Sequence, residues 1–204
     1  MRLFVAVWPP PEVLDLVAEI DRPALAGVRW TTRDQWHVTL RFLGRMDGID
    51  AAGARLAEAA AAVRGSRGVG SVEPVGQGGP PGSLESLGSV ASAAGGSVAS
   101  ADVVASAGPL TRCLGRSIVM LPVGGLDDLA TTVVRLTASI GEPPPSRPFT
   151  GHLTLARGKP GIKVQSLAGV AVSATWPVSE VTLVSSELRP HGARYEIVAR
   201  FPLG

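Results

Sequence analysis

Hydrophobic and polar residues form blocks along the chain, and these blocks predict an order of strands and helices. Residues 2–8 (RLFVAVW) are rich enough in β-branched and aromatic side chains for a buried strand, which the prolines at 9–11 end. A helix is expected over 11–20, because its apolar residues recur at helical spacing and proline is tolerated at a helix start. Strand character returns over 28–43, and the alanine-rich stretch 50–64 favours a second helix.

The second half of the chain repeats this order and then adds strands. Residues 116–123 (RSIVMLPV) predict a strand, and 126–140 predict a helix with its apolar side chains along one side. One further strand is expected around residues 150–159, followed by two alternating strands at 179–188 and 194–201. We therefore expect an α+β protein built of two similar lobes that face one another.

Residues 65–107 separate the two halves and differ from both in composition. They are almost all Gly, Ser, Ala, Val and Pro, and they include no aromatic residue. Such a segment buries too little apolar surface to offset its ordering entropy. We predict a flexible insertion within a single domain that spans residues 1–204, with ADVVASAG (101–108) as a candidate edge strand.

The charge of the chain is nearly balanced, but its cations are unusual. Nineteen Lys and Arg stand against seventeen Asp and Glu, and all the cations except Lys159 and Lys163 are arginines. The guanidinium fork suits phosphate oxygens. However, the absence of Asn and the abundance of Ala, Gly and Pro also fit the codon bias of a GC-rich genome, which we expect to account for the larger share.

Cysteine content and hydropathy bear on the compartment. Cys113 is the only cysteine, so no intramolecular disulfide can form, and a reducing cytoplasm is the expected location. The start of the chain, MRLFVAVWPPPEV, has no small-residue cleavage site and is expected to be a first strand instead of a signal peptide. No apolar stretch approaches the length that crosses a bilayer, so we expect no membrane association.

One pattern of histidine, apolar residue, threonine and leucine occurs in each half, at His37-Val38-Thr39-Leu40 and His152-Leu153-Thr154-Leu155. Alternate side chains of a strand point to opposite faces. His37, Thr39 and Arg41 should then share a polar face, opposite a core face formed by Val38, Leu40 and Phe42. His152 and Thr154 should share a face in the same way, and the third histidine, His191, is expected at the surface.

Two such faces brought together would form a cleft with two imidazoles and two hydroxyls. Imidazoles that flank a phosphate can act as general acid and general base, because histidine titrates near neutrality. A single copy of the pattern would most often be incidental, but two copies favour a shared site. A metal site is less favoured because neither pattern contains a carboxylate, and Asp34 is expected to close a turn. Cys113 has no histidine near it in sequence, which disfavours a nucleophilic role.

The paired patterns resemble those of the 2H phosphoesterase superfamily. More narrowly, four stretches in order resemble the bacterial and archaeal RNA 2′,3′-cyclic phosphodiesterases, also described as 2′-5′ RNA ligases. These stretches are RLFVAVWPP, RWTTRDQWHVTLRFLG, RPFTGHLTLARGK and VTLVSSELRPHGARYEIVARFPLG. The resemblance covers both ends and the central strand-helix unit, and it leaves residues 65–107 unmatched.

The resemblance implies a bilobal α+β fold, with two antiparallel sheets flanked by helices around a central cleft. It implies hydrolysis of 2′,3′-cyclic phosphate ends of RNA or nucleotides to 2′-phosphomonoesters, without a metal or another cofactor. His37 is then the general acid for the departing 3′ oxygen and His152 the base that activates water. Thr39 and Thr154 would hold the non-bridging oxygens, and Arg157 would offset charge that develops on phosphorus. A monomer without an obligate protein partner is expected.

Other residues and functions stay open on the sequence alone. Arg41 either steers RNA phosphates or lies at a solvated rim, and Trp30 and Trp36 either stack a base or belong to the core. Tyr195 and Ser186 match the family's carboxy-terminal pattern, for which we expect a mainly structural role. A 2′-5′ RNA ligase in the same cleft is the main alternative activity. A binding module without turnover ranks last because both histidines are present.

Overall fold

The computed structural model describes residues 1–66, 102–189 and 192–204, and most of the predicted insertion lies outside these ranges. The described part consists of ten strands, three α-helices and two short 3-10 turns. The elements are β1 (Arg2–Val7), α1 (Pro11–Ala18), β2 (Val28–Trp30), η1 (Arg33–Gln35), β3 (Val38–Arg45), α2 (Asp50–Ser66), β4 (Val104–Ala107), β5 (Arg112–Leu114), β6 (Ile118–Gly124), α3 (Asp127–Leu136), β7 (His152–Gly158), η2 (Gln165–Leu167), β8 (Ala174–Pro177), β9 (Glu180–Arg189) and β10 (Gly192–Pro202).

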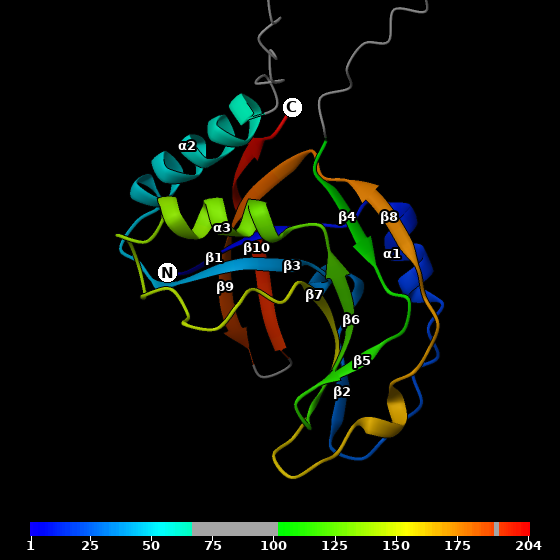
Figure 1. Cartoon of the computed structure of the whole chain (residues 1–204). Helices are drawn as coiled ribbons and strands as arrows, with labels where there is room; N and C mark the ends of the chain where they lie inside the picture. The colour runs from blue at the N-terminus through cyan, green and yellow to red at the C-terminus, as the bar shows by residue number, and fades with distance from the viewer. Residues whose placement is uncertain (67–101, 190–191) are drawn as a thin grey trace, which may run out of the picture.

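The strands follow one curled, antiparallel path in the order β10-β9-β1-β3-β7-β6-β4-β8, with β2 beside β7 and β5 beside β6 (Figure 1). The first four strands of this path form one half and the last four the other. The halves are joined where β3 meets β7, through the single pair Val38 and Leu153. The predicted α+β class is therefore confirmed, with the two motif strands next to each other at the joint.

Helices cover one face of the first half of the sheet. In Figure 1, α2 and α3 lie side by side over these strands, and both pack against the sheet. Alternate residues of β1, Leu3, Val5 and Val7, are buried in this main core because they point toward the helices. The other set, Phe4 and Ala6, belongs to a second, smaller cluster on the opposite face. The first half therefore has one face under helices and one face on which a site can form.

Most predicted elements are confirmed within a few residues of their expected bounds. Two short strands, β5 and β8, were not predicted, because three or four residues are too few to show a period. ADVVASAG contains β4, which pairs with β6 on one side and β8 on the other, so it is not an edge strand. Residues 104–107 of the predicted insertion are thus a strand between two others, and the flexibility of 67–101 stays a prediction outside the described residues.

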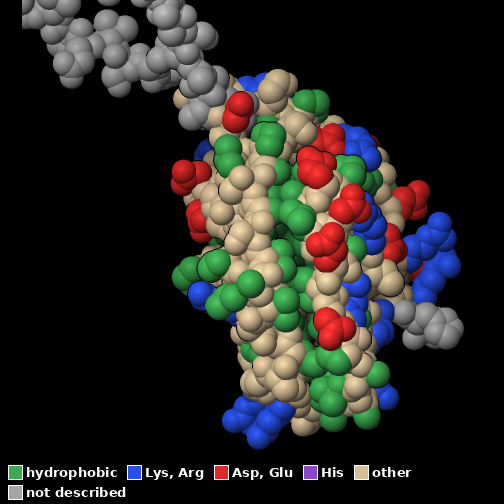
Figure 2. Space-filling model, turned by 90° about the vertical axis from the view of Figure 1, so that its right-hand side faces the viewer, with side chains coloured by type: hydrophobic (Ala, Val, Ile, Leu, Met, Phe, Trp, Pro, Cys, Tyr) green, Lys and Arg blue, Asp and Glu red, His purple; other side chains and the backbone are tan. Residues whose placement is uncertain are grey.

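The side of the molecule that carries α1 and β8 is rich in acidic side chains, and no histidine is visible on it (Figure 2). On α1 the exposed residues include Glu12 and Asp15. None of the helices in the described ranges has the length and apolar character needed to span a membrane.

Candidate active site

The two histidine patterns meet at the joint between the halves of the sheet. Val38 of the first pattern pairs with Leu153 of the second, and each follows its histidine directly. The two sequence-distant histidines are therefore neighbours. Burial is the main cause that lowers the pKa of His37, and the nearby charges of His152 and Arg157 lower it further.

Both motif strands contain a β-bulge at the leucine that ends the pattern. The register of β1 on β3 passes from Arg41 to Thr39 and skips Leu40, and the register of β6 on β7 passes from Ala156 to Thr154 and skips Leu155. A bulge places one extra residue in a strand and so shifts the alternation of faces beyond it. Leu40 lies in the core as predicted, but beyond the first bulge Arg41 and Phe42 lie on the faces opposite to those predicted.

Arg41 shows the consequence in the first strand. It lies on the core side with 2% of its surface exposed. Its Nη2 donates to the backbone carbonyls of Thr137, Ile140 and Glu142 at 3.2, 3.3 and 2.9 Å. These carbonyls follow the carboxy-terminal end of α3, where a helix leaves carbonyl groups unsatisfied. The suggested steering of RNA by Arg41 is wrong, because its guanidinium is used to hold this segment against β3.

Phe42 is displaced in the opposite sense, from the core face to the exposed face. It was expected on the core face, but it is 58% exposed and its ring centroid lies 5.6 Å from that of Phe4. Phe4 in turn lies 4.8 Å from the ring of His37. Phe42 and Arg157 each stand five residues after the histidine of their pattern, and both are exposed beyond the bulge. The bulges thus put a phenyl ring in one half where the other half has a guanidinium.

Three aromatic rings surround His37. Its ring centroid is 4.8 Å from Phe4, 5.0 Å from Trp8 and 4.9 Å from Tyr195, which meets it edge-on at 86°. Burial among these rings lowers the pKa of His37 to about 4, with smaller effects of the charges on His152 and Arg157, while the Gln35 backbone opposes the shift. His37 Nδ1 is buried and forms no hydrogen bond of good geometry with the described residues. In the free protein His37 is therefore neutral at pH 7.

His152 has a different setting. Both histidines are half-exposed, but the Nδ1 of His152 lies 2.8 Å from the backbone carbonyl of Thr150. A carbonyl can only accept, so Nδ1 carries the hydrogen. In the neutral ring Nε2 is then the unprotonated nitrogen. The structure thereby gives His152 a defined tautomer, with Nε2 as its basic atom.

The two threonines and Arg157 complete the predicted set. Thr39 pairs with Ala6 and Thr154 with Met120, and both side chains are half-exposed. Neither hydroxyl hydrogen-bonds to another residue in the described ranges, so both can bind a ligand. Arg157 is exposed, and its charge lowers the pKa of Tyr195 as well as that of His37, although burial raises the Tyr195 pKa overall.

The sequence left Tyr195 and Trp8 out of the site, although both lie against His37. Tyr195 matched the resemblance but was expected to be structural, and Trp8 ends a strand that was expected to be only core. Trp36 is a core residue, because it is 2% exposed and its Nε1 donates to Thr31 at 2.9 Å. Trp30 is half-buried and donates to the Pro23 carbonyl at 3.1 Å. His191 lies outside the described residues.

The described side chains do not form a metal site. Within residues 1–66, 102–189 and 192–204, no group of three or more His, Cys, Asp or Glu side chains is arranged to hold a metal ion. Cys113 is a half-buried free thiol on β5.

Comparisons with known proteins place the fold. A family model described as LigT like Phosphoesterase matches residues 7–73, which include the first histidine pattern. The crystal structure of TT0787 of Thermus thermophilus is 25% identical, with a TM-score of 0.66 over 100% of this chain and 98% of the other. E. coli LigT complexed with 3′-AMP is 21% identical, with a TM-score of 0.61 over 99% and 97%. The comparison with curated proteins finds no match.

The chain has the fold of LigT-like phosphoesterases, and the family model matches the region that contains the first histidine pattern. The family model and the structural matches confirm the resemblance to the 2H phosphoesterases.

Proposed function

We propose that this protein hydrolyses 2′,3′-cyclic phosphate ends of RNA or nucleotides to 2′-phosphomonoesters, with His37 and His152 as the acid-base pair. The observation that supports this most is the pair Val38 and Leu153, which brings the two histidines together at the joint of the sheet. The nucleotide and phosphate complexes of E. coli LigT, a protein of the same fold, support a phosphate-bearing substrate.

His152 is suited to be the base. Its Nδ1–H is held by the Thr150 carbonyl, so Nε2 is free to remove a proton from water. The water oxygen then attacks phosphorus, and the bond between phosphorus and the 3′ oxygen breaks. The 2′ oxygen keeps the phosphate.

His37 is the acid in this scheme, and it must be protonated to give a proton to the departing 3′ oxygen. Its pKa of about 4 leaves it neutral in the free protein. A bound phosphate anion favours the imidazolium because opposite charges at short range stabilise each other. We propose that substrate binding supplies the charge that keeps His37 protonated. After turnover His37 has lost a proton and His152 has gained one, and exchange with solvent resets the pair.

Thr39, Thr154 and Arg157 hold the phosphate in this proposal. The hydroxyls donate to non-bridging oxygens, and Arg157 stabilises the extra negative charge of the transition state. No step in this scheme uses a metal ion or another cofactor.

The test is to incubate the purified protein with nucleoside 2′,3′-cyclic monophosphates in excess EDTA and to identify the product by chromatography against 2′- and 3′-monophosphate standards. Formation of the 2′-phosphate in chelator is expected. Loss of turnover in EDTA that a divalent ion restores would overturn the metal-free scheme. Adding a 5′-hydroxyl oligonucleotide tests ligation in the same sample, and binding without turnover would leave only a binding module.

A further inference from the structure

The face of the sheet that carries His37 continues past Phe42 to the far end of β1. β1 alternates regularly against β9, so Arg2, Phe4 and Ala6 lie on the same face. Phe4 contacts His37, and Arg2 is two residues, or about 7 Å, farther along the strand. Arg45 pairs directly with Arg2 and so lies on this face too. The face therefore runs from the histidines across phenyl rings to two arginines.

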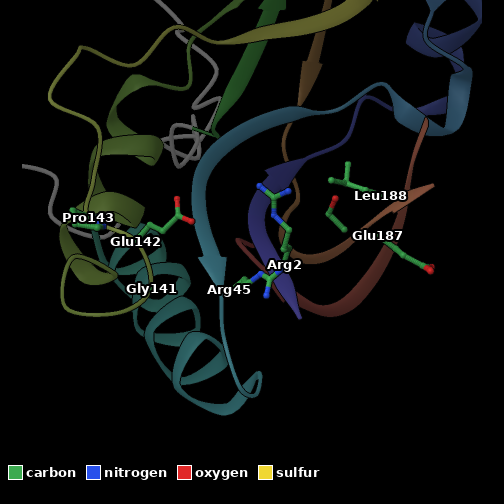
Figure 3. A pocket seen from close by; sticks show the side chains of 8 residues that line it. Arg2, Arg45, Gly141, Glu142, Pro143, Glu187 and Leu188 are labelled. Carbon is green, nitrogen blue, oxygen red and sulfur yellow. The ribbon is translucent and has the colours of Figure 1, made fainter. Parts of the chain in front are cut away.

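An open pocket of about 740 Å³ lies at this end (Figure 3). It is lined by Arg2, Arg45, Gly141, Glu142, Pro143, Ser186, Glu187 and Leu188. Figure 3 shows Arg2 and Arg45 on neighbouring strands, with the segment that carries Glu142 on the other side of β3. The pocket is thus built where the two arginines approach the segment that follows α3.

The two arginines of this pocket are not paired with its acidic side chains and can therefore bind an anion. Neither Arg2 nor Arg45 forms an ion pair with a described residue, and both are exposed. Glu187 is bound by its neighbour Arg189 at 2.9 Å. Glu142 has no ion pair among the described residues either, so it is the one acidic side chain that opposes an anion here. Two cations against one unpaired carboxylate favour a ligand with a single negative charge.

Phe42 stands between the arginines and the histidines. Exposed aromatic rings next to cationic side chains are the elements with which proteins bind single-stranded nucleic acids, since bases stack on the rings and phosphates meet the cations. An RNA that ends in a 2′,3′-cyclic phosphate continues from its last nucleotide through a phosphodiester on the 5′ side. This arrangement of phosphate, base and phosphate matches the order of histidines, Phe42 and arginines along the face.

We propose that Arg2 and Arg45 form a second phosphate subsite, which binds the phosphodiester on the 5′ side of the terminal nucleotide, with the terminal base stacked on Phe42. This inference rests on the proposed function and makes it more specific. The substrate class is an oligonucleotide with a cyclic end, in preference to a mononucleotide.

The experiment compares two substrates with the full-length protein, uridine 2′,3′-cyclic phosphate and a uridine trinucleotide with the same end. Arg2→Gln and Arg45→Gln should each lower kcat/KM for the trinucleotide by about tenfold and make it less dependent on salt, because a phosphate contact is lost. The mononucleotide rate should stay the same. Arg2→Lys should keep part of the effect, and Glu142→Gln should raise kcat/KM for the trinucleotide.

Arg55→Gln is the matched control, because it removes one positive charge from α2, which covers the other face of the sheet. It should change neither substrate. Equal losses on both substrates, or no loss from either arginine variant, would overturn the subsite.

A binding measurement separates this inference from the activity itself. Fluorescence anisotropy with a labelled uridine trinucleotide that bears a 3′-phosphate needs no turnover, and the two arginine variants should weaken binding by about tenfold. If no cyclic phosphate is hydrolysed but the variants weaken binding, the activity is wrong and the subsite stands. If hydrolysis occurs and the variants bind as the original chain does, the subsite is wrong and the activity stands.

Discussion

The two motif strands, β3 and β7, share four residues of pattern and a bulge at the same leucine, yet they prepare their histidines differently. His37 lies among three aromatic rings, and burial lowers its pKa to about 4. His152 instead donates a hydrogen bond from Nδ1 to the backbone carbonyl of Thr150. The repeated sequence therefore sets the positions of the two imidazoles, while the residues around each strand set their charge and tautomer.

The same contrast continues beyond the bulges. The position five residues after the histidine holds Phe42 in one half and Arg157 in the other. A phenyl ring can support a base, and a guanidinium can support a phosphate. A duplicated pattern of this kind gives an asymmetric pair of surfaces, which suits the proposed nucleotide substrate because its base and phosphate would be bound side by side.

Removing either histidine breaks the pair most directly. His37→Ala and His152→Ala should each lower the rate by on the order of 10² to 10⁴, because each removes one proton transfer. The double variant should lose clearly less than the product of the two losses, because both groups serve one displacement. Steady-state rates on a nucleoside 2′,3′-cyclic phosphate measure this.

A substrate whose leaving group needs no protonation then separates the two roles. With bis(p-nitrophenyl) phosphate, the His37→Ala variant should recover and the His152→Ala variant should not. Equal recovery of both, or of neither, would contradict the assignment of acid and base.

The pH dependence sharpens the difference in setting. A rate that needs one protonated and one neutral histidine passes through a maximum, and kcat/KM reports the ionisations of the free protein. Burial lowers the pKa of His37 to about 4 in the free protein, so one limb of the kcat/KM profile should lie near pH 4. This limb lies well below the pKa of an ordinary histidine. Replacing Trp8 by Ala should move this limb toward neutrality, and an unmoved limb would contradict burial as its cause.

That the two histidine strands come together could be predicted from the sequence, but the residues that surround each histidine could not. His37, Thr39, His152 and Thr154 could be found because a repeated pattern with strand character marks them. Arg41 and Phe42 were placed on the wrong faces because a bulge leaves no trace in an alternating pattern. The three aromatic side chains around His37 are Phe4 on β1, Trp8 just after β1, and Tyr195 on β10. These strands are brought to β3 only by the pairing of distant segments, which the sequence pattern does not show.

Replacing Arg157 and Phe42, the exposed residues beyond the two bulges, tests the asymmetry of the site. Arg157→Gln should lower kcat by about 10² because it removes a donor to the charged transition state. Phe42→Leu should raise KM about tenfold for nucleotides and leave kcat nearly unchanged, since it removes only stacking. On bis(p-nitrophenyl) phosphate at subsaturating concentration, the Phe42 variant should keep more of its kcat/KM than the Arg157 variant. If both variants changed only KM, Arg157 would have no role in the transition state.

A variant of Arg41 tests whether this side chain stabilises the fold, as its buried position indicates, or contacts RNA. Arg41→Met keeps much of the side-chain volume but removes the guanidinium that donates to the carbonyls of Thr137, Ile140 and Glu142, of which the bond to Thr137 is buried. The free energy of unfolding should fall by about 2–3 kcal/mol, measured by urea denaturation. The kcat/KM for a trinucleotide should keep its salt dependence at a temperature where the variant is folded. A weaker salt dependence with unchanged stability would restore the role in steering RNA.

The threonines should give the smallest effects, and the comparison between them is informative because both belong to the repeated pattern. Thr39→Val and Thr154→Val keep the side-chain shape and remove one hydroxyl donor each, which costs about 0.5–1.5 kcal/mol, or roughly two- to twelvefold in kcat/KM. Both hydroxyls lack partners among the described residues, so stability should change little. If the two hydroxyls bind equivalent phosphate oxygens, the two losses should be similar and the double variant should show their product. A loss confined to Thr154 would mean that the phosphate sits nearer β7, on the side of Arg157, and would place Thr39 with the base-binding half of the site.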